Sequence, residues 1–423
     1  MKLKTLVFAT ALTLLAALVL PTLCLAQAHN QKFPNYTVID LGTLDGGTFS
    51  LAGGISNSGW IEGLATQSDG TEHAVLWRKG VMTDLGTLGG PNSAAAFPPS
   101  NSGDAAGTAE TGAVDPYLEN FCDFEDNLIC LPFYWNHRTK SMTTLPTLGG
   151  NNGQAAGVNN NEQAAGFAEN TIPEPTCVGI GTSQYFQIEP VVWTKGRIRQ
   201  LPTFPGDPDG EAYAINDWGQ ATGWSGPCLY TVHALLWQNG RAINLGHLGG
   251  NYATGTGINE WGQVAGSSTL PGDQVQHAFL WSWGTLTDLG TLPGDAYSSA
   301  DGVNDWGQVA GASEDVYGDI RAFLWQNGVM VDLNTLIPPD SPLYLLDANG
   351  GINDEGQIVG YAYVLSTGQV HAFLATPVWG AGKDQDLNIN RTVPRVTLPE
   401  NVRKLMQQHM RLQQPKAGPT LPH

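Results

Sequence analysis

The chain has 423 residues, of which 13% are charged, with 38 acidic residues against 19 Lys and Arg and a formal net charge of −19. So few basic residues argue against a nucleic-acid or anionic-membrane surface. A hydrophobic content of 41%, with 13 Trp, 13 Phe and 12 Tyr, is enough to fill a core and excludes a disordered chain.

Residues 1–28 have the three regions of a secretory signal peptide: a basic start at Met1–Lys4, an apolar stretch at 6–20, and an A-x-A site that ends at Ala28. The apolar stretch is shorter than the roughly 20 residues needed to span a bilayer. Cys24 follows Leu23 rather than a small residue, which disfavours lipoprotein cleavage. We therefore expect cleavage near Ala28, secretion to the periplasm or outside the cell, and no membrane span.

A repeat dominates residues 29–376. The phrase Ile-Asn-Glu-Trp-Gly-Gln-Val-Ala-Gly at 258–266 recurs at 303–311, and weaker copies bring the total to seven. A second phrase, of the type Asp-Leu-Gly-Thr-Leu, places its first Leu at seven positions: 41, 85, 145, 201, 245, 289 and 333. Four of the six intervals are 44 residues, and the two longer ones indicate inserted loops. Such self-similarity is typical of repeat architectures.

Each repeat contains four short strand-like runs: one that ends in Gly-Ile-Asn, then Gly-Gln-Val-Ala-Gly, then His-Ala-Phe-Leu-Trp, then a run such as 329–333. Tight Asn-Asp-Trp-Gly and Asn-Gly links separate them, as in hairpins. Four strands per 40–50 residues is the size of a β-propeller blade. The sequence thus predicts an all-β, seven-bladed β-propeller of four-stranded blades, with the small-residue strands near the axis.

The ends of the repeat region predict how the ring closes. The seventh repeat stops after its third strand, at 371–375, whereas Tyr36–Leu41 is a copy of the fourth strand with nothing before it. We expect this N-terminal strand to join the last blade as its outermost strand, which closes the propeller without a bare edge.

The phrases Asp-Leu-Gly-Thr-Leu, Ile-Asn-Asp-x-Gly-Gln-Val-x-Gly and His-Ala-Phe-Leu-Trp resemble the HAF-repeat family of probable extracellular proteins, over residues 36–376. The resemblance implies export and a repeated β unit, but it implies no catalytic residues. Leu131 and Glu189 replace the repeat's His, and Glu162 replaces its hairpin Gly, so repeats two and three are the weaker copies.

Four cysteines remain after removal of the signal peptide, all in long loops that follow the second strand of repeats two, three and four. An even number in an oxidising compartment favours disulfides, with three possible connectivities. We expect Cys122–Cys130 within one loop and Cys177–Cys228 between neighbouring repeats. Such loops either form a rigid recognition surface or are simply held in order by the cross-links.

Two acidic clusters and a set of histidines raise the question of metal binding. The clusters are Asp115, Glu119, Asp123, Glu125 and Asp126, and Asp207, Asp209 and Glu211. Neither has the full calcium-loop spacing, so we expect solvated acidic loops and no cofactor, with calcium the weaker alternative. The third strand begins with His73, His233, His277 or His371 in four repeats and with Arg321 in another. These positions lie too far apart to share one ion, so we expect a repeated structural hydrogen bond and no metal site.

Trp218, Trp261 and Trp306 occupy the first hairpin turn of three consecutive repeats, and Trp60 lies nearby in the first. The favoured interpretation is that each indole packs on the neighbouring repeat. The sharper hypothesis is a ligand-binding array, because exposed aromatic rings stack on sugars and repeated rings give avidity.

The last residues, 377–423, carry seven Lys or Arg against three acidic residues. We expect a mostly disordered tail, with a short amphipathic helix over 400–412 that presents Val402, Leu405, Met406 and His409 on one side. A charge-assisted dock onto the acidic propeller is the sharper alternative.

No enzyme signature such as H-E-x-x-H, G-x-S-x-G, a Walker loop or C-x-x-C is present. We therefore expect an exported binding or scaffold module for carbohydrate or protein of the envelope or outside the cell. The alternative is a secreted glycosidase or lyase that uses acidic residues near the axis. A purely structural surface protein is a third possibility.

Overall fold

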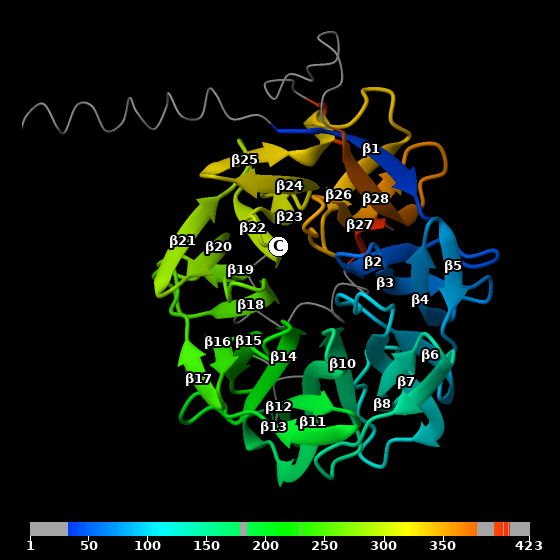
Figure 1. Ribbon diagram of the computed structural model, residues 1–423, viewed down its shortest axis with the longest axis vertical. Coiled ribbons are helices and arrows are strands. Elements are labelled where there is room, and N and C mark those ends of the chain that lie inside the picture. The colour runs from blue at the N-terminus through cyan, green and yellow to red at the C-terminus, as the bar shows by residue number, and fades with distance from the viewer. Residues whose placement is uncertain are drawn as a thin grey trace, which may run out of the picture.

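The computed structural model describes residues 33–177, 184–228, 230–378, 393–400, 402–404 and 406. The expected signal peptide, Cys24 and most of the tail, including Leu405 and His409, lie outside the described residues. In the described part, 28 strands form seven four-stranded antiparallel sheets arranged in a ring (Figure 1). The predicted seven-bladed β-propeller is confirmed.

Blades are numbered in chain order, and the strands of each are given from the innermost to the outermost. In blade 7 the outermost strand comes from the N-terminus. Blade 1 is β2 (Ser50–Ile55), β3 (Ile61–Thr66), β4 (Glu72–Arg78) and β5 (Val81–Asp84); blade 2 is β6 (Gly89–Ala94), β7 (Ala105–Val114), β8 (Leu128–Asn136) and β9 (Ser141–Thr144); blade 3 is β10 (Gly153–Val158), β11 (Gln163–Pro173), β12 (Phe186–Thr194) and β13 (Arg197–Gln200). Blade 4 is β14 (Asp209–Ile215), β15 (Ala221–Gly226), β16 (His233–Gln238) and β17 (Arg241–Asn244); blade 5 is β18 (Ala253–Ile258), β19 (Val264–Thr269), β20 (Gln276–Ser282) and β21 (Thr285–Gly290); blade 6 is β22 (Tyr297–Val303), β23 (Val309–Glu314), β24 (Ile320–Gln326) and β25 (Val329–Asp332); blade 7 is β26 (Leu343–Asp347), β27 (Ile358–Val364), β28 (Val370–Val378) and β1 (Asn35–Asp40).

The first strand of the chain completes the last blade. β1 pairs antiparallel with β28, from Asn35 opposite Val378 to Asp40 opposite Phe373, and forms the outer edge of that sheet (Figure 1). Tyr36 is 2% exposed, and its backbone N–H donates to Leu336 O at 2.8 Å. The N-terminal strand is therefore tied both to its own sheet and to the connection from blade 6.

The glycine that ends each Gly-Gln-Val-x-Gly phrase is required by close approach of two strands. A Cβ on Gly223 would lie 1.9 Å from the carbonyl oxygen of Glu211, and one on Gly311 would lie 2.1 Å from that of Ser299. In both blades the innermost strand has a register shift at this point. Any side chain here would push the innermost strand away from the second.

The histidine at the start of the third strand makes the repeated hydrogen bond expected from the sequence. The Nδ1 of His73 lies 2.8 Å from the Asp84 carboxylate. The Nδ1 of His277 lies 2.9 Å from the Asp288 carboxylate. His371 makes the same contact with Asp40 of β1 at 3.0 Å, so the pair also fastens the two ends of the chain. The hydrogen bond from Asp84 raises the pKa of His73.

The third-strand tryptophans fill the space between neighbouring blades. Trp77, Trp193 and Trp237 are at most 2% exposed, and each indole N–H donates to a carbonyl in the connection before its blade, at 2.7–3.0 Å. Each indole thus buries a large apolar area and has its one polar atom satisfied.

No helix in the described ranges is long and apolar enough to cross a membrane.

Candidate functional site

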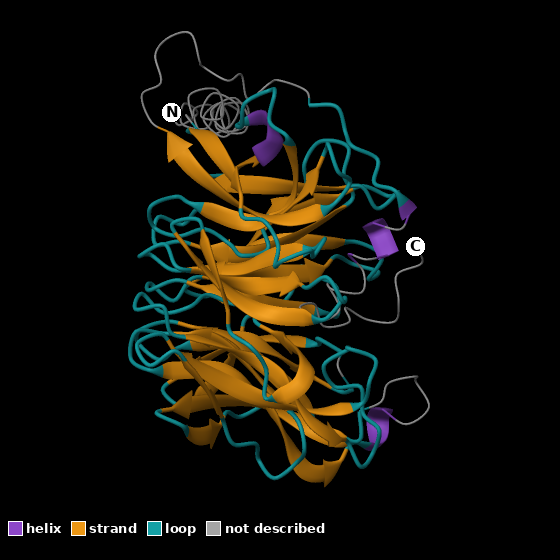
Figure 2. Cartoon of the chain, turned by 90° about the vertical axis from the view of Figure 1, so that its right-hand side faces the viewer, coloured by secondary structure: helices purple, strands orange, loops and turns teal. Residues whose placement is uncertain are grey.

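The disc has two faces, which are seen edge-on in Figure 2. The turns between first and second strands define one, here called the hairpin face. The loops between second and third strands define the other, here called the loop face. The space around the axis between the innermost strands, which holds the cavity described below, is here called the channel. Each candidate residue belongs to one of these faces or to the channel.

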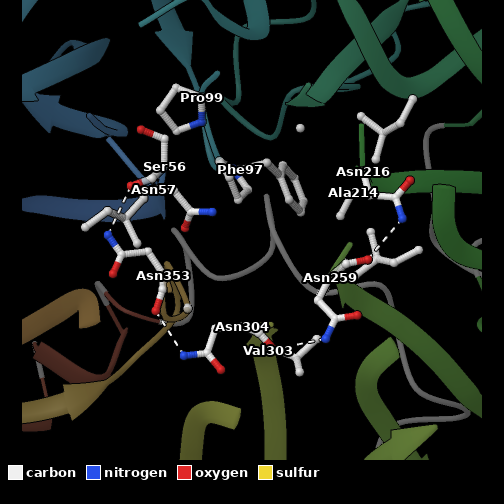
Figure 3. Close-up of a pocket in the computed structure, with 18 of the residues that line it drawn as sticks. Ser56, Asn57, Phe97, Pro99, Ala214, Asn216, Asn259, Val303, Asn304 and Asn353 are labelled. Carbon is white, nitrogen blue, oxygen red and sulfur yellow. Dashed lines mark hydrogen bonds between the residues drawn. The ribbon is translucent and has the colours of Figure 1, made fainter. Parts of the chain in front are cut away.

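A ring of asparagine side chains surrounds the channel at the hairpin face. In each of five blades the Nδ2 of this asparagine donates to the backbone carbonyl of the next blade at 2.9–3.1 Å, and Figure 3 shows the links from Asn216 round to Ser56 as dashed lines. The five residues are Asn159, Asn216, Asn259, Asn304 and Asn353. Ser56 and Ser100 take the equivalent positions in blades 1 and 2. Because the Oδ1 of each asparagine accepts backbone N–H groups of its own turn, one side chain both shapes the turn and links two blades.

The next residue along each turn forms a second ring. Its side chain accepts the backbone N–H of the preceding blade: Asp305 N–H donates to Asp354 at 2.8 Å, and Glu260 N–H donates to Asp305 at 2.9 Å. These residues are acidic in four consecutive blades, at Asp217, Glu260, Asp305 and Asp354. Burial, and then the neighbouring carboxylates, raise the pKa of Glu260 and Asp305. One half of the channel mouth is therefore negative.

The favoured interpretation, that the tryptophans of the hairpin turns pack on the neighbouring blade, holds only in part: the Trp306 indole N–H donates to the Asp354 carbonyl of blade 7 at 2.9 Å, but all three rings are largely exposed. Trp218, Trp261 and Trp306 are 78%, 62% and 75% exposed. Each follows directly after an acid of the second ring, and its backbone N–H donates to the ring asparagine at 3.1–3.2 Å. The indoles are thus presented to solvent from fixed turns of blades 4, 5 and 6.

Trp60 has a different environment from the other three. It is half-buried, with the His137 ring 4.3 Å away and the Arg78 guanidinium 5.2 Å from its ring centroid. The packing interpretation is correct for this residue, so the structure groups three of the four candidate tryptophans and not Trp60.

The channel contains a cavity of about 170 Å³ at its hairpin end. The Phe97 and Tyr213 rings stack at its wall, 5.3 Å apart, and Asp301 and Asn349 contribute polar atoms (Figure 3 labels Phe97). The Tyr213 hydroxyl donates to Glu211 at 2.5 Å, and burial raises the pKa of that glutamate to about 7. A polar, aromatic cavity of this kind suits a small ligand.

Two carboxyl groups meet beside this cavity. Asp301 on β22 and Asp347 on β26 come from the innermost strands of neighbouring blades, and Asp347 is 1% exposed. Burial, and then the charge of Asp347 and a hydrogen bond with it, raise the pKa of Asp301 well above its usual range. Burial also raises the pKa of Asp347 to about 6, although the Tyr361 hydroxyl donates to it at 3.2 Å. Both carboxyl groups therefore hold a proton more tightly than a free carboxyl does.

Disulfides cross-link the long loops of the loop face. The structure contains the expected pairs Cys122–Cys130 and Cys177–Cys228, with Cα–Cα distances of 6.2 and 5.0 Å. The inserted residues also lengthen β7 and β11 to 10 and 11 residues, so the loops are shorter than the sequence suggested. The second disulfide ties blade 3 to blade 4.

The acidic clusters of the sequence are divided among several hydrogen-bond networks. Asp115 and Glu119 converge with Glu169 on the side-chain nitrogen of Asn152, at 3.2–3.4 Å, so an amide fills the place between them. Burial, and then the charge of Glu119, raise the pKa of Glu169 to about 8. Within the described ranges no group of three or more His, Cys, Asp or Glu is arranged to hold a metal ion.

The remaining acids do not gather either. Asp126 lies beside Glu110, whose pKa rises to about 8 through burial and then this contact. Asp207 accepts from His233 at 2.8 Å, whereas Asp209 accepts the Ile188 backbone N–H at 3.0 Å. Asn120, in turn, contacts both Asp123 and Glu125 within the first loop.

Sequence reasoning missed the two rings and the Asp301–Asp347 pair. The asparagine recurs in five of the seven copies of the repeated phrase, and its repetition at the turn was a usable signal. The carboxyl pair had no such signal. Asp301 and Asp347 occupy non-equivalent positions of the repeat, and they come together only because blades 6 and 7 are neighbours.

No family model matches the chain, and no curated protein matches it. Solved structures do match, all at low identity. An oligogalacturonate lyase in complex with manganese is 12% identical, with 82% of this chain and 96% of that chain covered and a TM-score of 0.49. The β-propeller domain of the trilobed protease from Pyrococcus furiosus is 9% identical, with 85% and 98% covered and a TM-score of 0.42. Pyrococcus horikoshii acylaminoacyl peptidase is 12% identical with a TM-score of 0.46; 77% of this chain is covered, and it spans about half (51%) of that protein.

Proposed function

We propose that this protein is an exported β-propeller that binds carbohydrate of the cell envelope or of the surroundings through its hairpin face. The observation that carries the proposal is the array of Trp218, Trp261 and Trp306, which are 62–78% exposed on three consecutive blades. Large exposed apolar groups on a folded surface mark interaction sites. Flat indoles on fixed turns suit the apolar faces of sugar rings, and neighbouring platforms give avidity for a polymer.

Three further features support export. They are the signal-like residues 1–28, the two disulfides, and the resemblance of the repeats to the HAF-repeat family of probable extracellular proteins. Disulfides persist in oxidising compartments. Membership of that family is part of the proposal.

The test is a glycan array followed by calorimetry on the best ligand. Replacing Trp218, Trp261 and Trp306 by Ala should weaken binding by about tenfold for each stacked ring lost. Trp283→Ala is the matched control, because Trp283 is 75% exposed but lies outside the first-hairpin turns. Absence of any glycan ligand, or equal binding by the triple variant and wild type, overturns the proposal.

A secreted carbohydrate-active enzyme is the second candidate, and the Asp301–Asp347 pair is the observation that favours it. Burial raises the pKa of both carboxyls, and a raised pKa suits a carboxyl that acts as a general acid. The pair ranks second because directly hydrogen-bonded carboxyls leave no room for a sugar between them, whereas glycosidases hold theirs about 5 Å or more apart. Turnover of a bound glycan that is lost in Asp301→Asn would favour the enzyme.

A further inference from the structure

The C-terminal segment 393–406 lies on the loop face, across the end of the channel opposite the hairpin turns. Its described residues contact the loop between β23 and β24, the connection between blades 5 and 6, and the innermost strands of blades 1 and 7. The described residues of the tail thus dock on the propeller, which was the alternative expected from the opposite charges of the two. The contacts are of two kinds, ionic and apolar.

Two arginines make the ionic contacts. The Arg395 guanidinium bridges Asp295 and Asp315, whose side chains are 0% and 9% exposed. Arg403 Nη2 lies 2.8 Å from Asp319 Oδ1, and its Nη1 donates to the Tyr317 carbonyl at 2.6 Å. Buried, hydrogen-bonded guanidinium–carboxylate pairs of this geometry are stronger than exposed ones.

Three apolar residues of the segment make the other contacts. Leu398, Val402 and Met406 are 3–4% exposed and follow one another at intervals of four residues. They pack against Leu51 and Leu346 of the innermost strands, in a cluster whose other buried members include Phe49, Tyr344, Tyr361 and Val370. The segment therefore covers this end of the channel with its apolar residues, while its arginines bind the acidic residues beside it.

The acidic part of the receiving surface is also held by groups of the propeller itself. Arg321 holds Asp295 at 2.8 Å, and the backbone N–H groups of Tyr317 and Asp319 hold Asp315 Oδ1 at 2.8 and 3.1 Å. The segment also makes a turn of its own, in which the Val402 and Arg403 N–H groups donate to the Pro399 carbonyl at 2.9 and 3.0 Å. An acidic and apolar surface that receives a short amphipathic segment is the arrangement of a peptide-binding site.

We propose that the loop-face mouth of the channel is a recognition site for a basic, amphipathic segment of a protein partner, and that residues 393–406 occupy it in the free chain. The pattern that the site selects is Arg-x2-Leu-x3-Val-Arg-x2-Met. Charge complementarity argues for a basic partner, since Asp295, Asp315 and Asp319 all face the occupant. Tethering gives the chain's own segment an effective concentration in the millimolar range, so a partner must displace it.

The test measures binding of a fluorescent peptide with the sequence of residues 393–406 to the full-length protein. In wild type the tethered segment competes, so the peptide binds weakly. In the Arg395→Ala/Arg403→Ala variant the site is vacated, and we expect at least tenfold tighter binding that weakens as salt rises. Arg411→Ala/Lys416→Ala is the matched control, because it removes the same charge from the tail outside the segment, and it should bind as wild type does.

Two further arms make the result decisive. Adding Asp319→Asn to the vacated variant should reduce peptide binding, as should a peptide in which both arginines are replaced by glutamate. Circular dichroism and the melting temperature confirm that each variant is folded. The proposal is overturned if the peptide binds neither protein, or if wild type and the vacated variant bind it equally well. It is also overturned if the Asp319→Asn change has no effect.

Discussion

Asn304 offers the sharpest test of the asparagine ring. Its Oδ1 accepts from the backbone N–H of Trp306 and of Gln308, and its Nδ2 donates to the Asn353 carbonyl and to Gln308 Oε1, at 2.7–3.2 Å. The residue is 3% exposed, so water cannot replace these four bonds. At about 1 kcal/mol net for each bond, Asn304→Ala should lower the free energy of unfolding by about 3–4 kcal/mol.

The assay is urea denaturation followed by tryptophan fluorescence, with two comparison variants. Asn304→Asp keeps the acceptor but removes both Nδ2 bonds, to the Asn353 carbonyl and to Gln308 Oε1, and should also be strongly destabilising. Asn161→Ala removes one exposed hydrogen bond of 2.7 Å to the Asp217 carbonyl and should cost under about 0.5 kcal/mol. A loss of less than about 1 kcal/mol in Asn304→Ala would refute the ring as a structural link.

Three other predictions concern stability. Glu169 holds a proton in the folded chain up to about pH 8 but releases it near pH 4 when unfolded, so the free energy of unfolding should fall from pH 5 to pH 8. Glu169→Gln should reduce that slope by up to about 1.4 kcal/mol per pH unit in urea titrations, and an unchanged slope would count against the raised pKa of Glu169. Glu162 has a φ of +58°, so Glu162→Gly should raise stability by about 1 kcal/mol in the same assay, whereas a loss would contradict the strain. Deleting residues 35–41 removes buried Tyr36 and Leu41 and should cost at least about 3 kcal/mol, seen as a lower or less cooperative melt; an identical melt would show that β1 does not close the ring.

The sequence predicted the blades well because each blade is a local object. Its turns, its alternating strands and its His–Asp pair all lie within about 45 residues, and seven copies repeat the evidence. Closure by β1 was also predictable, because the seventh repeat lacks a fourth strand and the N-terminal residues are an extra copy of that strand.

The site was less predictable, because its properties depend on relations between blades. Exposure of Trp218 is set by how far its turn projects above the neighbouring turn, which no local pattern encodes. The raised pKa of Asp301 depends in part on Asp347, so it requires two innermost strands 46 residues apart to meet at the axis. The docked segment shows the same limit, since its charge indicated attraction but not the place, which Asp295 and Asp315 determine.

The pairing of β1 with β28 also constrains the order in which the protein can be made. The first strand to leave the ribosome has as its partner the last strand of the ring, more than 300 residues later. Blades 1 to 6 can form as they emerge, but blade 7 stays incomplete until residue 378 is free. Contacts so distant in sequence form slowly, so we expect completion of the disc to be a late step of folding.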